Sequence, residues 1–427
     1  MKQFPLCFFS VVVCTGLTCS TPASVFAQQG LTWDQVKARF EVSNPALKAD
    51  ADNVDEMRAE EITAYLRPNP QFTVTADGTQ IAPNHEVWQP LAGTFVSPSV
   101  SYLHERDHKR ELRLESAREG TRISESEHED LKRNLELALR TAFVNTLEAK
   151  TVLDMAKADL DYYDKIIEMS QDRLKAGDIA QIDFNRIELL RVQYESEVQS
   201  ALVNLRTAKI QLLQLLNDRT PVEQFDVTGP FDFSDVLQPL DDFRKTALDS
   251  RPDLQAALES MQQAQTNHKL AQANGSTDPT LSAWYTWNAS NNNPNATQTL
   301  GLSASVPLRI FDRNQGEKKR TQIDIERSRQ ASEATRAQVF SDVDSAYAQV
   351  ESNIALLKPY KAKYNDEALQ VRDTVTYSYQ HGGASLMDFL NAQTEYRQVQ
   401  LAYAQLVGAY LTAVAQLNFA VGREVIP

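Results

Sequence analysis

Cysteine is scarce in this sequence, and none of it lies beyond the first twenty residues. The three cysteines are Cys7, Cys14 and Cys19. Lipidation of Cys19 is the less favoured reading, because Gly16-Leu17-Thr18 before it is a poor lipobox. If the amino-terminal segment that contains them is removed as a signal peptide, the remaining chain has no thiol, no disulfide and no cysteine metal site.

An excess of positive charge is also absent. The chain has 43 Lys and Arg against 57 Asp and Glu, which gives a net charge of −14. Acidity spread along the chain argues against a phosphate backbone as the binding target. Nucleic acid is therefore not expected as a partner.

Long apolar runs are missing, except near the amino terminus. Lys2 is followed by a largely apolar run over residues 4–19 and then by small residues up to Ala27. This arrangement predicts a secretory signal peptide over residues 1–27, cleaved between Ala27 and Gln28. Beyond it no stretch of 18 apolar residues occurs, so no transmembrane helix is predicted. If the exported chain spans a membrane, it must do so with β-strands.

Two halves of the chain resemble each other at a nearly constant offset of 205 to 207 residues. Three pairs of segments carry the likeness in the same order: Asn44-Pro45-Ala46-Leu47 with Arg251-Pro252-Asp253-Leu254, Ser97–Val100 with Ser303–Val306, and Gly177–Phe184 with Gly382–Phe389. Three ordered pairs indicate a tandem duplication. We expect a first repeat over residues 28–229 and a second over 230–427.

Each half predicts a helix, two strands, a very long helix, a tight glycine turn and a return helix. Apolar residues recur at alternating spacings of four and three, as at Leu135, Leu139 and Ala142, which is the seam of a coiled coil. The expected helices are 33–66, 104–174, 182–217, 240–273, 312–379 and 387–421. A helix over 104–174 would be about 107 Å long. Because the two shorter helices of each half together match the long one in length, we expect them to stack end to end beside it.

Four strands are expected between the short and the long helices, over residues 71–80, 92–103, 279–290 and 297–308. Apolar and polar residues alternate along them, and each has about the ten residues that a tilted membrane strand needs. A soluble antiparallel sheet fits the alternation equally well. The signal peptide and the equivalent places of the strands in the duplication favour a membrane. Since the smallest membrane barrels have about eight strands, a spanning barrel requires several chains.

Further motifs carry a family resemblance. They are the opening Leu31-Thr32-Trp33, the two repeat segments that contain a proline, the two turns in which glycine precedes aspartate by six residues, and Ser305-Val306-Pro307-Leu308-Arg309-Ile310-Phe311-Asp312-Arg313-Asn314-Gln315-Gly316. With these motifs the whole mature chain resembles the TolC-type outer-membrane efflux protein family. The sequence of residues 307–316 looks most similar to that of the heavy-metal cation branch, although drug-export relatives share much of it.

The resemblance implies a mainly α-helical chain with a membrane β-barrel part. In a homotrimer, three sets of four strands would close one barrel of about twelve strands in the outer membrane of a Gram-negative-type bacterium. The helices would form a tunnel across the periplasm. The implied function is a passive exit duct of a tripartite efflux system, with no enzymatic activity, cofactor or metal site, that exports metal cations or small toxic compounds. Expected partners are outer-membrane lipid, a periplasmic membrane-fusion adaptor and an inner-membrane pump of the RND type or similar.

The resemblance also assigns residues to the periplasmic tips. Arg173, Leu174 and Gly177 on the first turn, and Gly382 and Gly383 on the second, are expected to contact the adaptor. Glycine permits the positive φ that reverses a helical hairpin. A simple helix end explains any single glycine equally well.

Asp183 and Asp388 lie just after these turns, where the family narrows its pore. In a trimer they would give two rings of three carboxylates, which favour cations in a constriction. The alternative is a carboxylate in the first turn of a helix, stabilised by the helix dipole. Tyr379 matches a gate tyrosine of the family, whereas Ala384 and Asn391 stand where some members have an arginine and an aspartate. The closed state is therefore expected to be held differently from theirs.

Two other functions remain open from the residues alone. His104-Glu105-Arg106-Asp107-His108 spells HExxH, which on one helical face is the signature of a zinc peptidase. Its charged flank and the lack of a persuasive third ligand make this the least favoured reading, although His128 lies 20 residues further on. The other alternative is a soluble periplasmic coiled-coil scaffold, which would bury the apolar faces of its strands.

Overall fold

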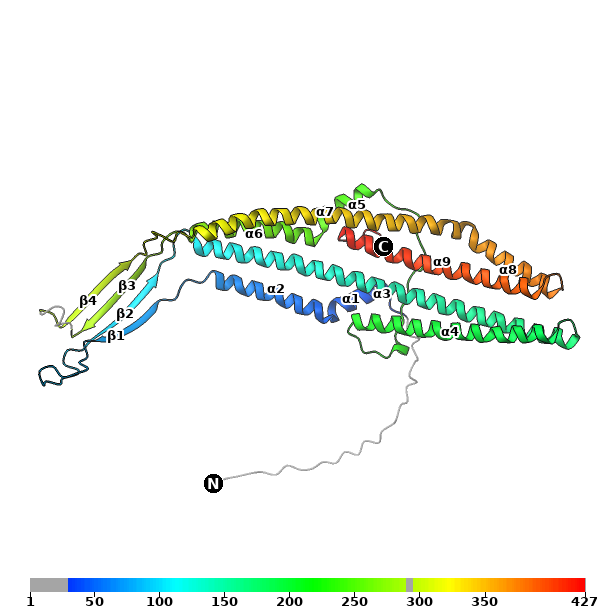
Figure 1. Ribbon diagram of the computed structural model, residues 1–427, viewed down its shortest axis with the longest axis horizontal. Coiled ribbons are helices and arrows are strands. Elements are labelled where there is room, and N and C mark those ends of the chain that lie inside the picture. The colour runs from blue at the N-terminus through cyan, green and yellow to red at the C-terminus, as the bar shows by residue number, and fades with distance from the viewer. Residues whose placement is uncertain (1–29, 289–294, 427) are drawn as a thin grey trace, which may run out of the picture.

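The computed structural model describes residues 30–288 and 295–426. Within them, long helices run side by side, and a four-stranded antiparallel sheet projects from one end of the helical body (Figure 1). The predicted signal peptide 1–27, with its cleavage site between Ala27 and Gln28, lies outside the described residues.

The longest helix is α3 (Lys109–Ala176), which runs along the whole helical body. The return helix α4 (Gln181–Leu215) lies beside the half of α3 that is far from the sheet. The short helices α1 (Trp33–Ser43) and α2 (Pro45–Ala64) continue from the end of α4 towards the sheet (Figure 1). The predicted stacking of short helices beside a long one is confirmed.

The second half of the chain follows the same plan. The short helices are α5 (Leu240–Ser250) and α6 (Pro252–Ala273), and α9 (Leu386–Val421) is the return helix. They accompany α7 (Gln315–Pro359) and α8 (Asn365–Gln380), which are joined by a π-helical turn. Helix α3 contacts α2 and α4 as well as α6 and α9, so it joins the two halves.

The predictions of continuous helices over 33–66 and 240–273 are wrong, because each is interrupted before a proline. Asn44 has φ −69° and ψ 121°, and Arg251 has φ −78° and ψ 118°. The ring of a proline disfavours helical backbone in the residue before it. Each break therefore follows from the local sequence.

Side chains at these two breaks bind the end of the neighbouring return helix. Four of them donate hydrogen bonds to the last carbonyls of α4 and α9: Ser43 to Leu216 at 2.6 Å, Asn44 to Leu215 at 3.0 Å, Ser250 to Val421 at 2.7 Å and Arg251 to Ala420 at 3.3 Å. The last carbonyls of a helix have no partner within that helix. The breaks supply these partners and so hold the stacked helix ends together.

The prediction of one helix over 312–379 is also wrong in its middle. Helix α7 ends at Pro359, and Tyr360–Tyr364 forms a π-helical turn before α8 begins. Proline has no N–H to donate, so the helix must adjust its hydrogen bonding where proline enters. Figure 1 shows a bend at this place, which turns α8 relative to α7.

The sheet contains β1 (Gln71–Asp77), β2 (Phe95–Leu103), β3 (Thr280–Trp287) and β4 (Gln298–Ser305), paired in this order. All neighbours are antiparallel. The strands lie where they were predicted but are three or four residues shorter. Strand β1 ends because Gly78 follows it with φ +77°, a left-handed conformation that favours glycine.

Helix α9 meets the length and hydropathy expected of a membrane span, although the sequence analysis predicted no transmembrane helix. Of its most apolar window, 56% is buried inside the protein. Val407, Tyr410 and Leu417 of α9 belong to one buried core with residues of α5 and α7. The core helix of a protein passes the same test as a membrane span, so α9 is better explained as the packed centre of the second half.

Candidate functional site

The sheet has one apolar and one polar face. Residues directly opposite each other in neighbouring strands share a face, so the register assigns both. One face carries Phe72, Val74, Val96, Pro98, Val100, Leu281, Ala283, Tyr285, Trp287, Leu300, Leu302 and Ala304. The other face is mostly Ser and Thr, and Ser97 and Thr286 hydrogen-bond across it at 2.9 Å.

The apolar face is uncovered within the described part of the chain. Phe72 is 69% exposed, Leu300 is 75% exposed and Leu302 is 76% exposed. The sheet projects beyond the helices, so no helix packs over it (Figure 1). A contiguous apolar surface of this kind marks a membrane or an interface. The soluble scaffold, which requires buried apolar faces, is therefore contradicted.

The opposite end of the body carries the two predicted tips. Gly177 ends α3 with φ +84°, and Gly382 follows α8 with φ +74°. A Cβ at either position would meet nothing within 4 Å. Glycine is therefore favoured here by the left-handed backbone conformation and not by a lack of room for a side chain. Arg173, Leu174 and Gly383 lie at the same tips. Their contact with an adaptor stays a prediction.

Two of the three predicted gate residues, Asp183 and Tyr379, lie close enough for the charge of Asp183 to act on Tyr379. Tyr379 is 4% exposed, with its ring 5.0 Å from the ring of Phe389 and 5.0 Å below the guanidinium of Arg173. Arg173 also donates to the Tyr379 carbonyl at 3.0 Å. Burial raises the pKa of Tyr379, the charge of Arg173 opposes this, and the carboxylate of Asp183 adds to it. Tyr379 therefore joins the two tips within one chain.

Asp388, the third predicted gate residue, lies apart from that contact and is exposed. Its carboxylate accepts hydrogen bonds from the N–H and the hydroxyl of Ser385 at 3.1 and 2.7 Å, and Ser385 caps α9 in return. These hydrogen bonds lower the pKa of Asp388. The residue combines a helix-capping role with a charge that faces solvent.

Two arginines that the sequence analysis did not single out join the hairpins α3–α4 and α8–α9. Arg372 of α8 lies 4.9 Å from the ring of Tyr162 on α3 and 4.2 Å from the ring of Tyr396 on α9. Tyr162 also donates to Thr376 of α8 at 3.1 Å. These contacts tie α8 to α3.

The second arginine ties α9 to α4. Arg397 forms an ion pair with Glu197 at 3.1 Å and lies 4.8 Å from the ring of Tyr194. We call Arg372, Arg397 and their partners Tyr162, Tyr194 and Glu197 the hairpin clamp. No motif marks these residues, because the contacts join positions about two hundred residues apart in the sequence.

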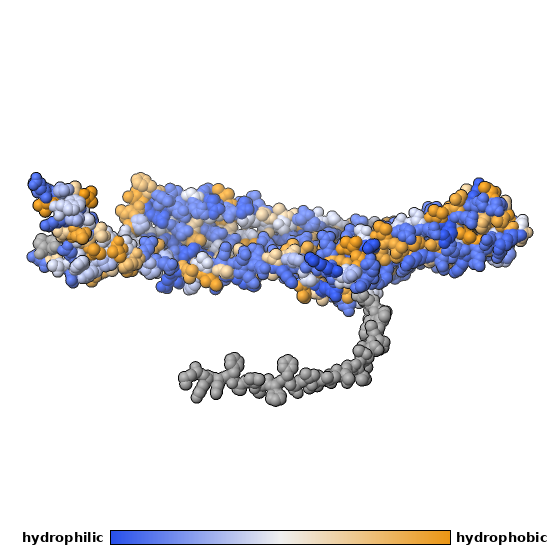
Figure 2. Space-filling view, turned by 90° about the horizontal axis from the view of Figure 1, so that it is seen from below, coloured by the Kyte–Doolittle hydropathy of each residue, from blue (hydrophilic) through white to orange (hydrophobic). Residues whose placement is uncertain are grey.

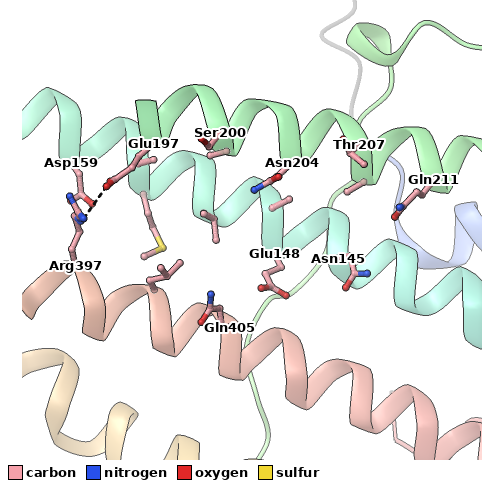
Figure 3. Close-up of a pocket in the computed structure, with 17 residues that line it drawn as sticks. Asn145, Glu148, Asp159, Glu197, Ser200, Asn204, Thr207, Gln211, Arg397 and Gln405 are labelled. Atoms are coloured by element: carbon pink, nitrogen blue, oxygen red, sulfur yellow. Dashed lines mark ion pairs between the residues drawn. The ribbon is translucent and has the colours of Figure 1, made fainter. Parts of the chain in front are cut away.

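A groove of about 630 Å³ begins beside the clamp, between α4 and α9, with α3 as its floor. Figure 3 shows the carboxylates of Asp159 and Glu197 close to the Arg397 guanidinium. Burial raises the pKa of Asp159 to about 6, although Arg397 opposes the shift. Burial also raises the pKa of Glu148, whose carboxylate lies so close to Gly408 that a Cβ there would clash at 2.1 Å.

We expect Asp159→Asn to raise the thermal stability of the protein at about pH 7.5. The folded-state pKa of Asp159 is about 6, above the ordinary 3.8. The folded chain therefore holds this proton more tightly than the unfolded chain, and the free energy of unfolding falls as the pH rises through 6. Asparagine carries no charge to desolvate. Melting curves between about pH 4.5 and 8 should therefore depend less on pH in the variant. Asp161→Asn, at an exposed position, is the control, and parallel curves for Asp159→Asn and wild type would contradict the expectation.

The HExxH sequence does not form a helix, so the prediction that its two histidines share a helical face is wrong. Helix α3 begins only at Lys109, and Asp107 and His108 both have left-handed backbone with φ 56°. The carboxylate of Glu105 is engaged by Arg113 at 2.5 and 2.9 Å. Among the described residues no group of three His, Cys, Asp or Glu is placed to hold a metal ion. The zinc peptidase is therefore unsupported.

A helical body with a two-faced sheet at one end is also found among solved outer-membrane channels, and sequence comparison points the same way. Residues 244–423 match the family described as outer membrane efflux protein. The cobalt-zinc-cadmium resistance protein CzcC of Cupriavidus metallidurans is 21% identical, over 89% of this chain and 87% of that protein. The outer membrane protein TolC of Escherichia coli is 24% identical, over 94% of this chain and 84% of that protein.

Solved structures show the same fold. CusC superimposes with a TM-score of 0.76 at 17% identity, covering 91% of this chain and 92% of the other. The open state of the Neisseria gonorrhoeae MtrE outer membrane channel gives a TM-score of 0.73 at 18% identity, covering 97% and 96%. The family model thus matches most of the second half of the chain, and the chain as a whole has the fold of solved outer-membrane channels.

Proposed function

We propose that three copies of this chain close one passive exit duct. The observation that carries the proposal is the four-stranded sheet with an exposed apolar face and two open edges, β1 and β4. Four strands cannot close a barrel, whereas three sets would supply enough for a closed one. Helix α3, with 68 residues, extends about 102 Å and would reach far across a periplasm.

The duct would work in a tripartite system, with a periplasmic membrane-fusion adaptor at the tips Arg173–Gly177 and Gly382–Gly383 and an inner-membrane pump that supplies the energy. It would catalyse no reaction itself. The similarity to the cobalt-zinc-cadmium resistance protein favours metal cations as the exported solute. Small toxic compounds are the second candidate for the exported solute.

We also propose that the chain consists of two repeats, 28–229 and 230–427. The equivalent breaks before Pro45 and Pro252 support this, since both donate hydrogen bonds to the carbonyl end of a return helix.

The protein mass of the complex extracted from outer-membrane fractions tests the assembly. Light scattering, corrected for bound detergent, should give the mass of three mature chains. A monomer released from the periplasm without detergent would overturn the proposal, because the four strands would then never have entered a membrane.

We expect Asp183→Asn combined with Asp388→Asn to reduce the preference of the reconstituted channel for cations. Six carboxylates of the proposed trimer would lose their charge at the constriction, while asparagine retains oxygen acceptors for capping. Reversal potentials in a planar bilayer measure the selectivity. Ser385→Ala, which weakens the cap but keeps the carboxylate, should leave selectivity unchanged. Unaltered conductance and selectivity in the double variant would refute the carboxylate rings.

A further inference from the structure

The segment between β4 and α7 exposes large apolar side chains at the junction of sheet and helices. Leu308 is 81% exposed, Ile310 is 61% exposed and Phe311 is 89% exposed. The segment has no regular secondary structure, so no backbone requirement explains these side chains. Figure 2 shows hydrophobic residues gathered at the end of the helical body next to the sheet.

Basic residues surround this segment in space. Because the strands are antiparallel, the start of β1, the end of β2, the start of β3 and the end of β4 lie together at one end of the sheet, the end next to the helices. At this end of the sheet lie Arg67 before β1, Arg106 after β2, and Arg309, Arg313 and Lys319 after β4. We call these five residues, together with Leu308, Ile310 and Phe311, the collar.

The basic residues of the collar lack ion-pair partners in the described part of the chain, whereas most of the nearby carboxylates are already paired. Glu105 is bound by Arg113, and Glu317 is bound by Arg320. Asp107 and Asp312 are the unpaired carboxylates of this region, and the carboxylate of Asp312 accepts the N–H of Asn314 at 2.8 Å. The Nε of Arg309 is buried without a hydrogen-bond partner. The collar therefore presents a surplus of unmatched positive charge beside exposed apolar groups.

We propose that the collar binds anionic phospholipids of the membrane leaflet nearest the periplasm. Arginine and lysine complement phosphate, and apolar side chains beside them enter the boundary of the acyl chains. The collar lies where the apolar face of the sheet ends, which is the level of the headgroups if the sheet spans the membrane. In this respect the inference rests on the proposed function and names a lipid partner for it.

The test uses the full chain, purified as its detergent complex and reconstituted into vesicles of phosphatidylethanolamine with or without about a fifth of phosphatidylglycerol. We expect phosphatidylglycerol to be enriched among the lipids retained by the wild type. The variant Arg106→Gln, Arg309→Gln, Arg313→Gln should lose this enrichment by at least about fivefold. A matched control, Lys48→Gln, Lys157→Gln, Arg336→Gln, removes three exposed charges of the helical body and should retain it.

A second variant, Leu308→Ser with Phe311→Ser, separates a lipid from a neighbouring copy. A trimer of normal mass with weakened lipid retention supports the collar. Loss of the trimer instead would make this surface an interface between copies and would overturn the lipid proposal. If the wild type is trimeric but retains both lipids equally, only the collar fails. If the wild type is a monomer that needs no detergent, the proposed channel itself fails.

Discussion

Replacing Arg372 and Arg397 together with alanine should raise the leak conductance of the reconstituted channel by about tenfold or more. The two side chains join α8 and α9 to α3 and α4 through three aromatic rings and one ion pair. Each cation–π contact contributes about 0.5 to 2 kcal/mol. If the hairpin clamp holds the duct closed, a loss of about 3 kcal/mol from the clamped arrangement would shift its equilibrium with an open one by about 150-fold.

Single-channel recording in a planar bilayer measures this leak. Arg320→Ala with Arg329→Ala is a matched control, because both arginines form exposed pairs within α7 and cross to no other helix. The control should keep the conductance of the wild type. An unchanged conductance in the clamp variant, with a trimer of normal mass, would show that the clamp does not hold the tips closed.

Replacing Arg251 with methionine should destabilise the folded chain by about 3 kcal/mol, the lower end of the usual cost of removing one partner of a buried ion pair. The Arg251 side chain is 3% exposed and binds Asp253 at 2.6 Å and Asp342 at 2.8 Å. Burial alone would raise the pKa of Asp253, but hydrogen bonds from Arg251 hold that pKa below its usual value. Methionine would fill the space, leave Asp342 without a cationic partner and leave Asp253 with only Arg133, at 3.6 Å. It would also remove the donor to Ala420 at the end of α9.

The melting temperature, compared at one fixed scan rate, measures this effect, since large assemblies unfold irreversibly. Arg244→Met is the control. It breaks a pair with Asp344 whose two side chains are 35% and 41% exposed, and exposed pairs contribute about 1 kcal/mol or less. Adding Asp253→Asn and Asp342→Asn to Arg251→Met should recover part of the loss. A fall in melting temperature no larger than that of Arg244→Met would contradict the assignment.

The order of the elements could be predicted because each element is encoded locally. A heptad seam shows along α3 and a strict alternation along β4, and each has its own period. The turns at Gly177 and Gly382 need a positive φ, which a glycine in the sequence indicates. The breaks at Asn44 and Arg251 were equally local, since each precedes a proline. Periodicity on both sides of each break concealed them.

The environment of the gate could be predicted only in part. Asp183, Tyr379 and Asp388 were placed near the tips because they follow or precede the glycine turns. Sequence gave no sign that Tyr379 is buried between Arg173 and Phe389, because its burial depends on how one hairpin lies against the other. The same holds for the hairpin clamp, whose members lie far apart in the chain.

The HExxH segment shows how the surroundings of a motif decide its meaning. The spacing of His104 and His108 has a chemical meaning only on a helix, and the chain turns from β2 into α3 at that point. The left-handed backbone of Asp107 and His108 makes that turn. Spacing alone could not reveal where the helix begins.

By itself, the sequence determined the type, order and approximate length of the helices and strands, together with an apolar and a polar side for each strand, because these depend on residues a few positions apart. Tertiary structure alone decided which faces stay uncovered, which arginines find aromatic partners and which carboxylates are buried. Those outcomes arise from contacts between distant segments, since the free energy of a charge or an apolar surface depends on what lies beside it in space.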